Sequence, residues 1–243
     1  MSNILDIENF DKYDYDNTKV SKLQKNFFLP AHKFRLIIVG SSGSGKSNLT
    51  LNLIKNQLVF DKLYIFSRHL EQPKYEYLKN YFDAMDNLLE EEYNVKHKTI
   101  ELFEETLDNI PVLDELDTKH KKLFVFDDFN IMTKKQESLI NDYFTRCRHK
   151  NCSIIFIGQI YFLIPRAVRL NLSHIILFNN GNNKEISLLY NELGTDLTRE
   201  EFKQMYLEAT NPKYNFLLID KNTDDIMLKY RKNFNEIFMP KLI

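Results

Sequence analysis

The chain has 243 residues, of which 43% are hydrophobic and 28% are charged, and its formal net charge is −1. This length and composition suit one globular α/β domain and argue against a disordered chain or a second full domain. The near-neutral charge gives no chain-wide basic field, so contact with nucleic acid would need a local basic patch or its repetition around an oligomer.

The cysteines and the apolar runs indicate a reducing intracellular compartment. Cys147 and Cys152 are the only cysteines, and they lack both CxxC spacing and histidine partners, which argues against a disulfide framework or a zinc site. No apolar run reaches the length that spans a bilayer, and the amino terminus opens on acidic and polar residues. We therefore expect reduced thiols and no membrane-spanning segment.

Residues 1–27 are expected to form an amino-terminal arm, and residues 28–243 the folded domain. The arm is rich in Asp, Asn and Tyr up to about Ser21 and has no sustained hydrophobic period. Such a segment is either a mobile or docking arm or a solvated tail.

Several apolar runs in the domain have the length and composition of buried strands. They are Phe34–Val39, Lys62–Ser67, Leu123–Phe126, Ser153–Ile157 and His174–Phe178. Near the carboxyl end, two further runs flank a turn-rich segment and predict the strands of a hairpin; these are Phe216–Ile219 and Ile226–Tyr230. The stretch 71–118 is charged and partly helical, and no specific role can be assigned to it from the sequence.

Helices are predicted between these runs. One is expected to begin at about Lys46, and two others have capping-box residues at their starts, Thr133 with Gln136 and Thr198 with Glu201. Strands that alternate with helices predict a mostly parallel central sheet flanked by helices, to which the hairpin adds antiparallel strands.

A glycine-rich loop joins the first predicted strand to the first predicted helix. It fits the pattern G-x-x-x-x-G-K-[ST] with Gly40, Ser41, Ser42, Gly43, Ser44, Gly45, Lys46 and Ser47. Backbone N–H groups of such a loop close around phosphate oxygens, and the helix N-terminus adds a partial positive charge. Lys46 is then expected to pair with the β- and γ-phosphates of ATP, and the Ser47 hydroxyl to hold Mg²⁺. The alternative is an ordinary glycine-serine turn.

Asp127 and Asp128 directly follow the predicted strand Leu123–Phe126, and Gln159 follows another strand. Carboxyl ends of parallel strands form the ligand-binding edge of an α/β sheet. Asp127 is therefore a candidate for orienting Mg²⁺, Asp128 for polarising the attacking water as a general base, and Gln159 for sensing the γ-phosphate. The alternatives are a strand-ending turn for the acidic pair and a surface loop for Gln159.

A basic cluster follows the helix predicted after Thr133, and it contains Arg146, Arg148, His149 and Lys150. Hydrolysis of ATP accelerates when a guanidinium reaches the γ-phosphate, and in ring ATPases the neighbouring subunit can supply it. Arg146 and Arg148 are the first candidates for this role, followed by Arg166 and Arg169. A DNA-facing or a merely solvated basic face explains the first cluster as well.

From about Phe28 to Phe238 the chain resembles the genome-packaging ATPases of large eukaryotic DNA viruses, virophages and their transposon relatives, a branch of the FtsK/HerA superfamily. The resemblance is carried by FRLIIVGSSGSGKSNL, KLFVFDDF, TRCRHKNCSIIFIGQIYFLIPRAVRLNLSHIILF and YNFLLIDKNTDDIMLKYRKNF. It implies a P-loop NTPase core of the ASCE type, a homo-oligomeric ring, and ATP-driven movement of double-stranded DNA into a preformed capsid in the virion or the viral factory. By position, Lys46 and Ser47 match the Walker A pair, Asp127 and Asp128 the Walker B pair, and Gln159 the polar sensor.

One departure from the cellular members of this superfamily bears on the catalytic base. Many of them have Glu as the second Walker B acid, whereas Asp128 is one methylene shorter.

Two other functions stay open: a small-molecule kinase, whose lid could lie within residues 71–118, and a non-enzymatic assembly factor that ATP only stabilises.

Overall fold

The computed structural model describes residues 28–129, 131–180, 182–194, 196–223 and 225–238, so the expected arm over residues 1–27 lies outside the described part. Nine strands of the described chain form one sheet in the order β3-β2-β4-β5-β1-β6-β7-β8-β9. Their bounds are β1 (Arg35–Val39), β2 (Lys62–Ser67), β3 (Ile100–Glu104), β4 (Lys122–Asp127), β5 (Cys152–Gly158), β6 (His174–Phe178), β7 (Phe216–Asp220), β8 (Tyr230–Lys232) and β9 (Glu236–Ile237).

The pairing of the strands confirms the predicted fold class. Strands β1 to β6 pair in parallel, whereas β7 to β9 continue the sheet in antiparallel fashion. β5 lies between β1 and β4, so the strand that leads into the glycine-rich loop is not adjacent to the strand that ends in the acidic pair. Parallel pairing brings the carboxyl ends of β1, β4 and β5 to one edge of the sheet.

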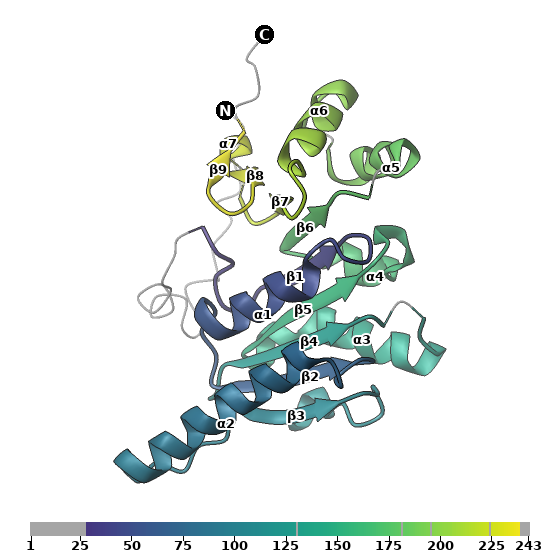
Figure 1. Ribbon diagram of the computed structural model, residues 1–243. Helices are drawn as coiled ribbons and strands as arrows, with labels where there is room; N and C mark the ends of the chain where they lie inside the picture. The colour runs from purple at the N-terminus through teal and green to yellow at the C-terminus, as the bar shows by residue number, and fades with distance from the viewer. Residues whose placement is uncertain (1–27, 130, 181, 195, 224, 239–243) are drawn as a thin grey trace, which may run out of the picture.

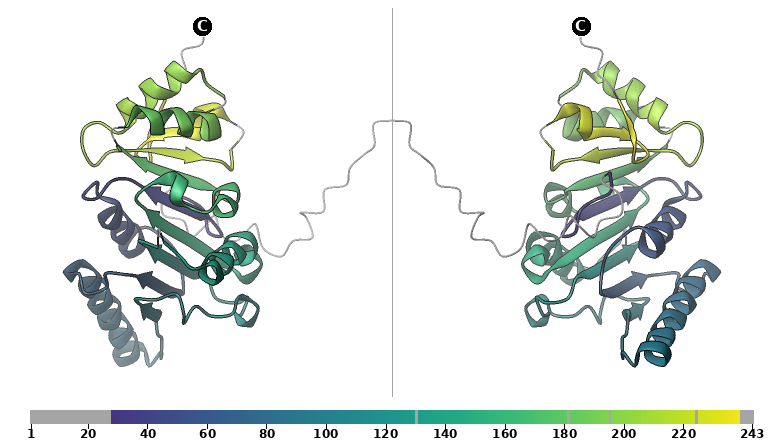
Figure 2. Two further views of the ribbon diagram at one scale, coloured as in Figure 1. Left: turned by 90° about the vertical axis from the view of Figure 1, so that its right-hand side faces the viewer. Right: turned by 90° about the vertical axis from the view of Figure 1, so that its left-hand side faces the viewer.

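Helices cover both faces of the sheet and make a three-layer molecule (Figures 1 and 2). One face carries α1 (Lys46–Asn56) and α2 (Pro73–Tyr93). The other face carries α3 (Lys134–Arg146), α4 (Arg166–Leu170), α5 (Asn183–Leu193) and α6 (Arg199–Ala209). None of the helices in the described ranges is long and apolar enough to cross a membrane.

Strand β1 shows why these residues form a central strand. Leu36 and Ile38 pack into the core under α1 and α2, whereas Ile37 and Val39 pack into the core on the opposite face. Each is at most 1% exposed. Because both faces of a parallel sheet are covered by helices, its strands need apolar residues at successive positions rather than at alternate ones.

Both predicted capping boxes are formed. The Gln136 N–H donates to Thr133 Oγ1 at 3.3 Å, and the Thr133 N–H donates to Gln136 Oε1 at 3.0 Å. Thr198 and Glu201 make the equivalent pair at 3.3 and 2.7 Å. Each box satisfies backbone donors that the first turn of a helix leaves without intrahelical partners.

Two parts of the sequence prediction differ from the structure. Ile226–Tyr230, expected as a hairpin strand, forms the one-turn helix α7 (Ile226–Lys229) before β8 begins at Tyr230. The Asp225 side chain accepts a hydrogen bond from the Met227 N–H at 2.9 Å and so caps this turn, an interaction that strand-like composition does not reveal. The unassigned stretch 71–118 contains α2 and the edge strand β3.

Candidate functional site

The glycine-rich loop leaves β1 at Gly40 and enters α1 at Lys46, as the motif predicts. A Cβ atom on Gly40 would lie 2.6 Å from both Phe178 Cβ and Ser44 Oγ, so a larger residue does not fit there. Gly45 has a φ of 107°, in the left-handed region that glycine adopts at little cost. The loop conformation therefore needs glycine at both motif positions.

The N-terminus of α1 is arranged to receive an anion. Gly45 is its N-cap and has no side chain to accept from the first N–H groups of the helix, and the first turn contains no acidic residue. The Lys46 ammonium folds back on the loop, donating to the carbonyl oxygens of Gly40 at 2.6 Å and Ser41 at 2.9 Å. Burial lowers the pKa of Lys46, and the nearby carboxylates of Asp127 and Asp128 act against this shift. A cation and a helix N-terminus thus meet at one point.

Asp127 and Asp128 occupy the carboxyl end of β4. Asp127 is 8% exposed, and one of its carboxylate oxygens accepts a hydrogen bond from the hydroxyl of Tyr75 on α2. Burial raises the pKa of Asp127, while the Tyr75 hydrogen bond lowers it. Burial also raises the pKa of the Tyr75 hydroxyl, so tyrosine stays the donor of this pair.

Asp128 is held from two sides. Its backbone φ is 64°, which is uncommon for residues other than glycine. Asp tolerates this left-handed region better than most other residues do. Gln159 Nε2 donates to Asp128 Oδ1 at 3.1 Å, and His69 Nε2 lies 3.6 Å from Asp128 Oδ2. The predicted base and the predicted sensor are therefore in direct contact.

These side chains line one cleft of about 340 Å³. Its walls include Lys46 and Ser47 from the loop, Asp127 and Asp128 from β4, and Gln159 from the end of β5. Ser42 and Gly43 also face it. The structure thus brings together four of the eight predicted loop residues, the acidic pair and Gln159.

Arg146 and Arg148 do not reach this cleft within the same chain. Arg146 ends α3, which runs back from the carboxyl end of β4 toward the start of β5, and it pairs with Asp142 at 3.1 Å and with Asp114. Arg148 follows in the short 3₁₀ helix Cys147–Lys150, immediately before β5. Both therefore lie at the amino-terminal edge of the sheet, opposite the glycine-rich loop.

The cleft also contains residues that the sequence analysis did not single out. They are His69, Gln72 and Lys74, which line it, and Tyr75, which holds Asp127 from behind. A signal for His69 and Gln72 was present, because the predicted strand Lys62–Ser67 ends shortly before them. Ser67 pairs with Asp127 in the parallel register of β2 and β4, so the segment after Ser67 must emerge beside the acidic pair.

The oxygen donors in the cleft fit Mg²⁺. The Ser47 hydroxyl and the Asp127 carboxylate both face it, and hard oxygen ligands are those that Mg²⁺ prefers. The described residues contain no group of three or more His, Cys, Asp or Glu side chains that could enclose a metal. A Mg²⁺ ion commonly takes only one or two protein ligands, and substrate phosphates and waters complete its shell.

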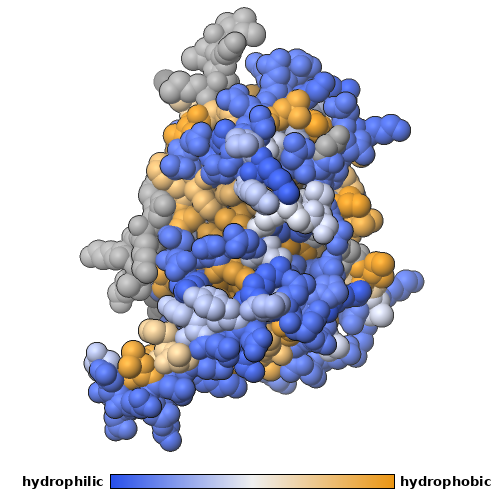
Figure 3. Space-filling view, in the orientation of Figure 1, coloured by the Kyte–Doolittle hydropathy of each residue, from blue (hydrophilic) through white to orange (hydrophobic). Residues whose placement is uncertain are grey.

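A larger cavity of about 530 Å³ lies on the other side of the loop, and we call it the aromatic cavity. It is lined by Gly45, Asn48, Leu49, Asn52, Phe178, Tyr214 and Phe216. In the space-filling view, hydrophobic side chains gather in a hollow between α1 and the carboxyl-terminal strands, the region to which these residues belong (Figure 3).

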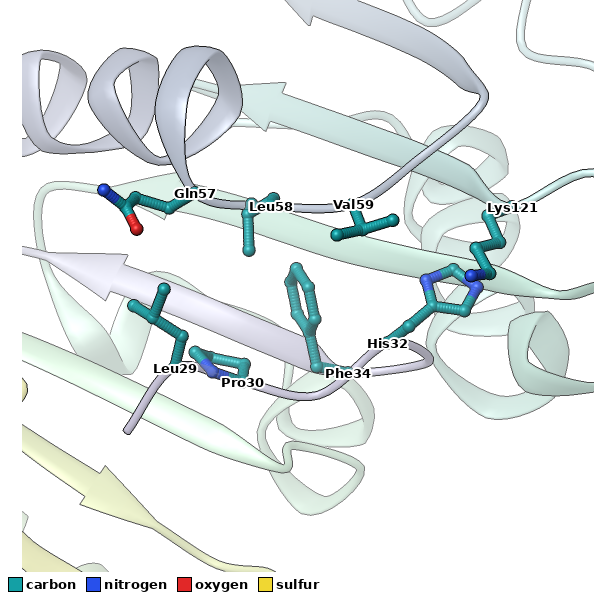
Figure 4. A pocket seen from close by; sticks show the side chains of 8 residues that line it. All are labelled: Leu29, Pro30, His32, Phe34, Gln57, Leu58, Val59 and Lys121. Atoms are coloured by element: carbon teal, nitrogen blue, oxygen red, sulfur yellow. The ribbon is translucent and has the colours of Figure 1, made fainter. Parts of the chain in front are cut away.

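A third and much smaller cavity, of about 20 Å³, lies at the amino-terminal edge of the sheet (Figure 4). His32 and Phe34 face Leu58 and Lys121 across it. A space of this size has room for about one water molecule, so it cannot hold a nucleotide.

Comparison with known proteins places this geometry in a viral context. Residues 21–222 match the family model described as Poxvirus A32 protein. The DNA packaging protein OPG160 of variola virus is 30% identical over 152 residues, which cover 60% of this chain and 53% of the relative. OPG160 of monkeypox virus is also 30% identical, with 48% of its length covered. The chain thus spans about half the length of the curated relatives it matches.

Solved structures share the fold at lower identity. The DNA-packaging ATPase B204 of Sulfolobus turreted icosahedral virus has a TM-score of 0.53 and 18% identity, over 78% of this chain and 93% of that chain. The genome packaging NTPase B204 of Sulfolobus turreted icosahedral virus 2, solved in complex with AMP, has a TM-score of 0.51 and 16% identity, over 86% and 98%. Because the family model covers most of the sequence, this chain belongs to the Poxvirus A32 protein family.

Proposed function

We propose that this chain binds ATP with Mg²⁺ and hydrolyses it to move double-stranded DNA into a viral capsid. The observation that carries the proposal is the meeting of Lys46, Ser47, Asp127, Asp128 and Gln159 in one cleft at the carboxyl edge of the sheet. Cation, hydroxyl, carboxylates and amide are the groups that phosphoryl transfer to water requires.

Each residue then has a distinct role. The N–H groups of the loop and the Lys46 ammonium bind the phosphates, and Lys46 exchanges its present carbonyl partners for phosphate oxygens. Ser47 and Asp127 would hold Mg²⁺, which neutralises the charge on the phosphates. Asp128 accepts the proton of the attacking water, and Gln159, already bonded to Asp128, orients that water.

DNA as the cargo is supported by the names of the relatives rather than by the cleft itself. OPG160 of variola virus is described as a DNA packaging protein, and B204 as a DNA-packaging ATPase. The structure of B204 in complex with AMP supports the proposal that a chain with this fold binds a nucleotide. A near-neutral chain that grips DNA needs its basic side chains repeated around a ring, and we propose that identical subunits form that ring around the duplex.

A ring also gives Arg146 or Arg148 a place in catalysis. Both lie at the edge opposite their own cleft, so only an adjacent subunit could bring one of them to a γ-phosphate. Arg146 would have to leave Asp142 and Asp114 to do so. If Arg146→Ala protein lowers the ATPase rate of wild-type protein when the two are mixed, catalysis is shared between neighbours.

The direct test is ATP hydrolysis measured with and without long duplex DNA. Wild type is expected to be stimulated by DNA, less so at high salt, whereas Lys46→Ala abolishes hydrolysis and Asp128→Asn binds ATP without turning it over. Lys96→Ala is the matched control, because the Lys96 side chain is 88% exposed on a distant surface.

Other outcomes would replace the proposal. ATPase activity that duplex DNA leaves unchanged under assembling conditions contradicts packaging. Transfer of phosphate to a nucleoside or metabolite indicates a kinase. If Asp128→Asn assembles and packages as wild type does, ATP has only a stabilising role.

A further inference from the structure

We propose that the aromatic cavity binds the nucleobase of the nucleotide and that the Tyr214 ring stacks on it. This assignment rests on the proposed function, because it extends the phosphate site of the glycine-rich loop to the rest of the same ligand.

The cavity continues the phosphate site on the far side of the loop. Ser42 and Gly43 line the cleft that contains Asp127, and they also line a smaller space of about 100 Å³ beside Phe178 and Tyr214. The same two aromatic residues line the aromatic cavity of about 530 Å³. A nucleotide whose phosphates follow the loop therefore has the acidic pair at one end and these rings at the other.

Tyr214 is presented to this space rather than packed into the core. It is 61% exposed, and its backbone φ of 78° lies in the left-handed region, which is uncommon for an aromatic residue. Its ring lies against the loop, since a Cβ on Gly45 would be 3.2 Å from Tyr214 Cδ1. Strained, exposed positions of this kind recur where a side chain clamps a ligand.

The surroundings of the ring suit a base attached to an anion. Lys213 Nζ lies 4.9 Å from the centre of the Tyr214 ring, and the described residues that line the aromatic cavity and the smaller space beside it include no carboxylate. The Asn48 amide on α1 supplies a donor and an acceptor for the edge of a base, and the Asn52 amide one turn later, which donates to the Asn48 carbonyl at 3.0 Å, keeps a second N–H. The volume falls within the range of small-molecule sites.

Binding of two probes to the full chain tests the assignment by calorimetry in the presence of Mg²⁺. AMPPCP carries the base, and inorganic tripolyphosphate carries only the phosphates. Stacking on an aromatic ring strengthens binding about 5- to 150-fold, so Tyr214→Ala should weaken AMPPCP binding by a factor in this range and leave tripolyphosphate binding unchanged. Tyr214→Phe should bind both probes as wild type does. Tyr93→Ala, at a residue 68% exposed at the end of α2, is the matched control.

Three results separate the assignment from the proposed function. Unchanged AMPPCP binding in Tyr214→Ala overturns the nucleobase site, and so does an equal loss of both probes, which would mean that the loop itself is distorted. If the alanine variant does not fold, Tyr214→Leu, which keeps an apolar side chain without a planar ring, gives the same comparison. Wild-type protein that binds neither probe overturns the proposed function as well.

Discussion

Replacing Tyr75 with Phe tests whether the buried tyrosine sets the metal affinity of the candidate site. The change deletes one hydroxyl from a side chain that is 1% exposed, and it leaves the Asp127 carboxylate without that donor. A hydrogen bond to a charged group contributes about 1.5–3 kcal/mol, equivalent to about 10- to 150-fold in an equilibrium. Groups that hold a metal ligand from behind typically change metal affinity about 10- to 100-fold.

We therefore expect the Mg²⁺ concentration for half-maximal ATPase activity to rise by about 10- to 100-fold in Tyr75→Phe, with the rate at saturating Mg²⁺ close to that of wild type. The pH profile should move as well. Burial already raises the pKa of Asp127, and the Tyr75 hydrogen bond opposes that shift. Without it the carboxyl takes up a proton at higher pH, so activity on the acidic side is lost earlier as pH falls.

The assay is ATP hydrolysis titrated with Mg²⁺ at several pH values, for wild type and the variant. Tyr143→Phe is a matched control, because Tyr143 is also fully buried but donates to the Pro111 carbonyl, remote from the cleft. Tyr75 does not set the metal affinity if Tyr75→Phe has the Mg²⁺ requirement and the pH profile of wild type, or if Tyr143→Phe shows the same changes.

Three further predictions concern stability. Burial lowers the pKa of His32 to about 4, so as pH falls below 6.5 the unfolded state takes up a proton before the folded state does. The free energy of unfolding should therefore drop by about 3 kcal/mol by pH 4. Urea unfolding at several pH values measures this drop, and the free energy of unfolding should depend less on pH in His32→Gln. Gly40→Ala forces a methyl group against Phe178, so it should lower the stability measured by thermal unfolding by roughly 1–3 kcal/mol and weaken nucleotide binding. Wild-type stability with intact binding would contradict the close approach of Gly40 to Phe178. Thr133→Ala removes the hydroxyl oxygen that accepts from the Gln136 N–H and should cost about 1 kcal/mol, a fall in Tm of about 2–4 °C by calorimetry. An unchanged Tm would mean that this side-chain cap adds nothing.

Much of the candidate site could be predicted because its residues follow predictable strands. The glycine-rich loop, the acidic pair and Gln159 each come directly after an apolar run, and parallel strands bring such positions to one edge. Tyr75 could not be found in this way. It meets Asp127 across 52 residues, in a helix whose charged sequence gave no clear period at its start.

The arginines illustrate a different limit. Residue type and the resemblance to ring ATPases singled out Arg146 and Arg148, but chain direction decides where they lie. A helix that follows a strand in a parallel sheet returns to the edge where the next strand begins, which places its last residues away from the ligand edge.

The one-turn helix α7 was missed for a local reason, since a single Asp225 cap outweighs the strand-like composition of the residues after it.

The insertion of β5 between β1 and β4 has a mechanical consequence. Neighbouring strands are about 4.8 Å apart, so the ends of β1 and β4 are separated by about 10 Å, and Gln159 at the end of β5 lies between them. Gln159 is itself exposed, and after it Ile160 is 45% and Leu163 54% exposed, whereas Tyr161 between them is fully buried. The change of partner that the proposed function asks of Gln159 would therefore take place directly beside Ile160, a residue open to contact with another molecule.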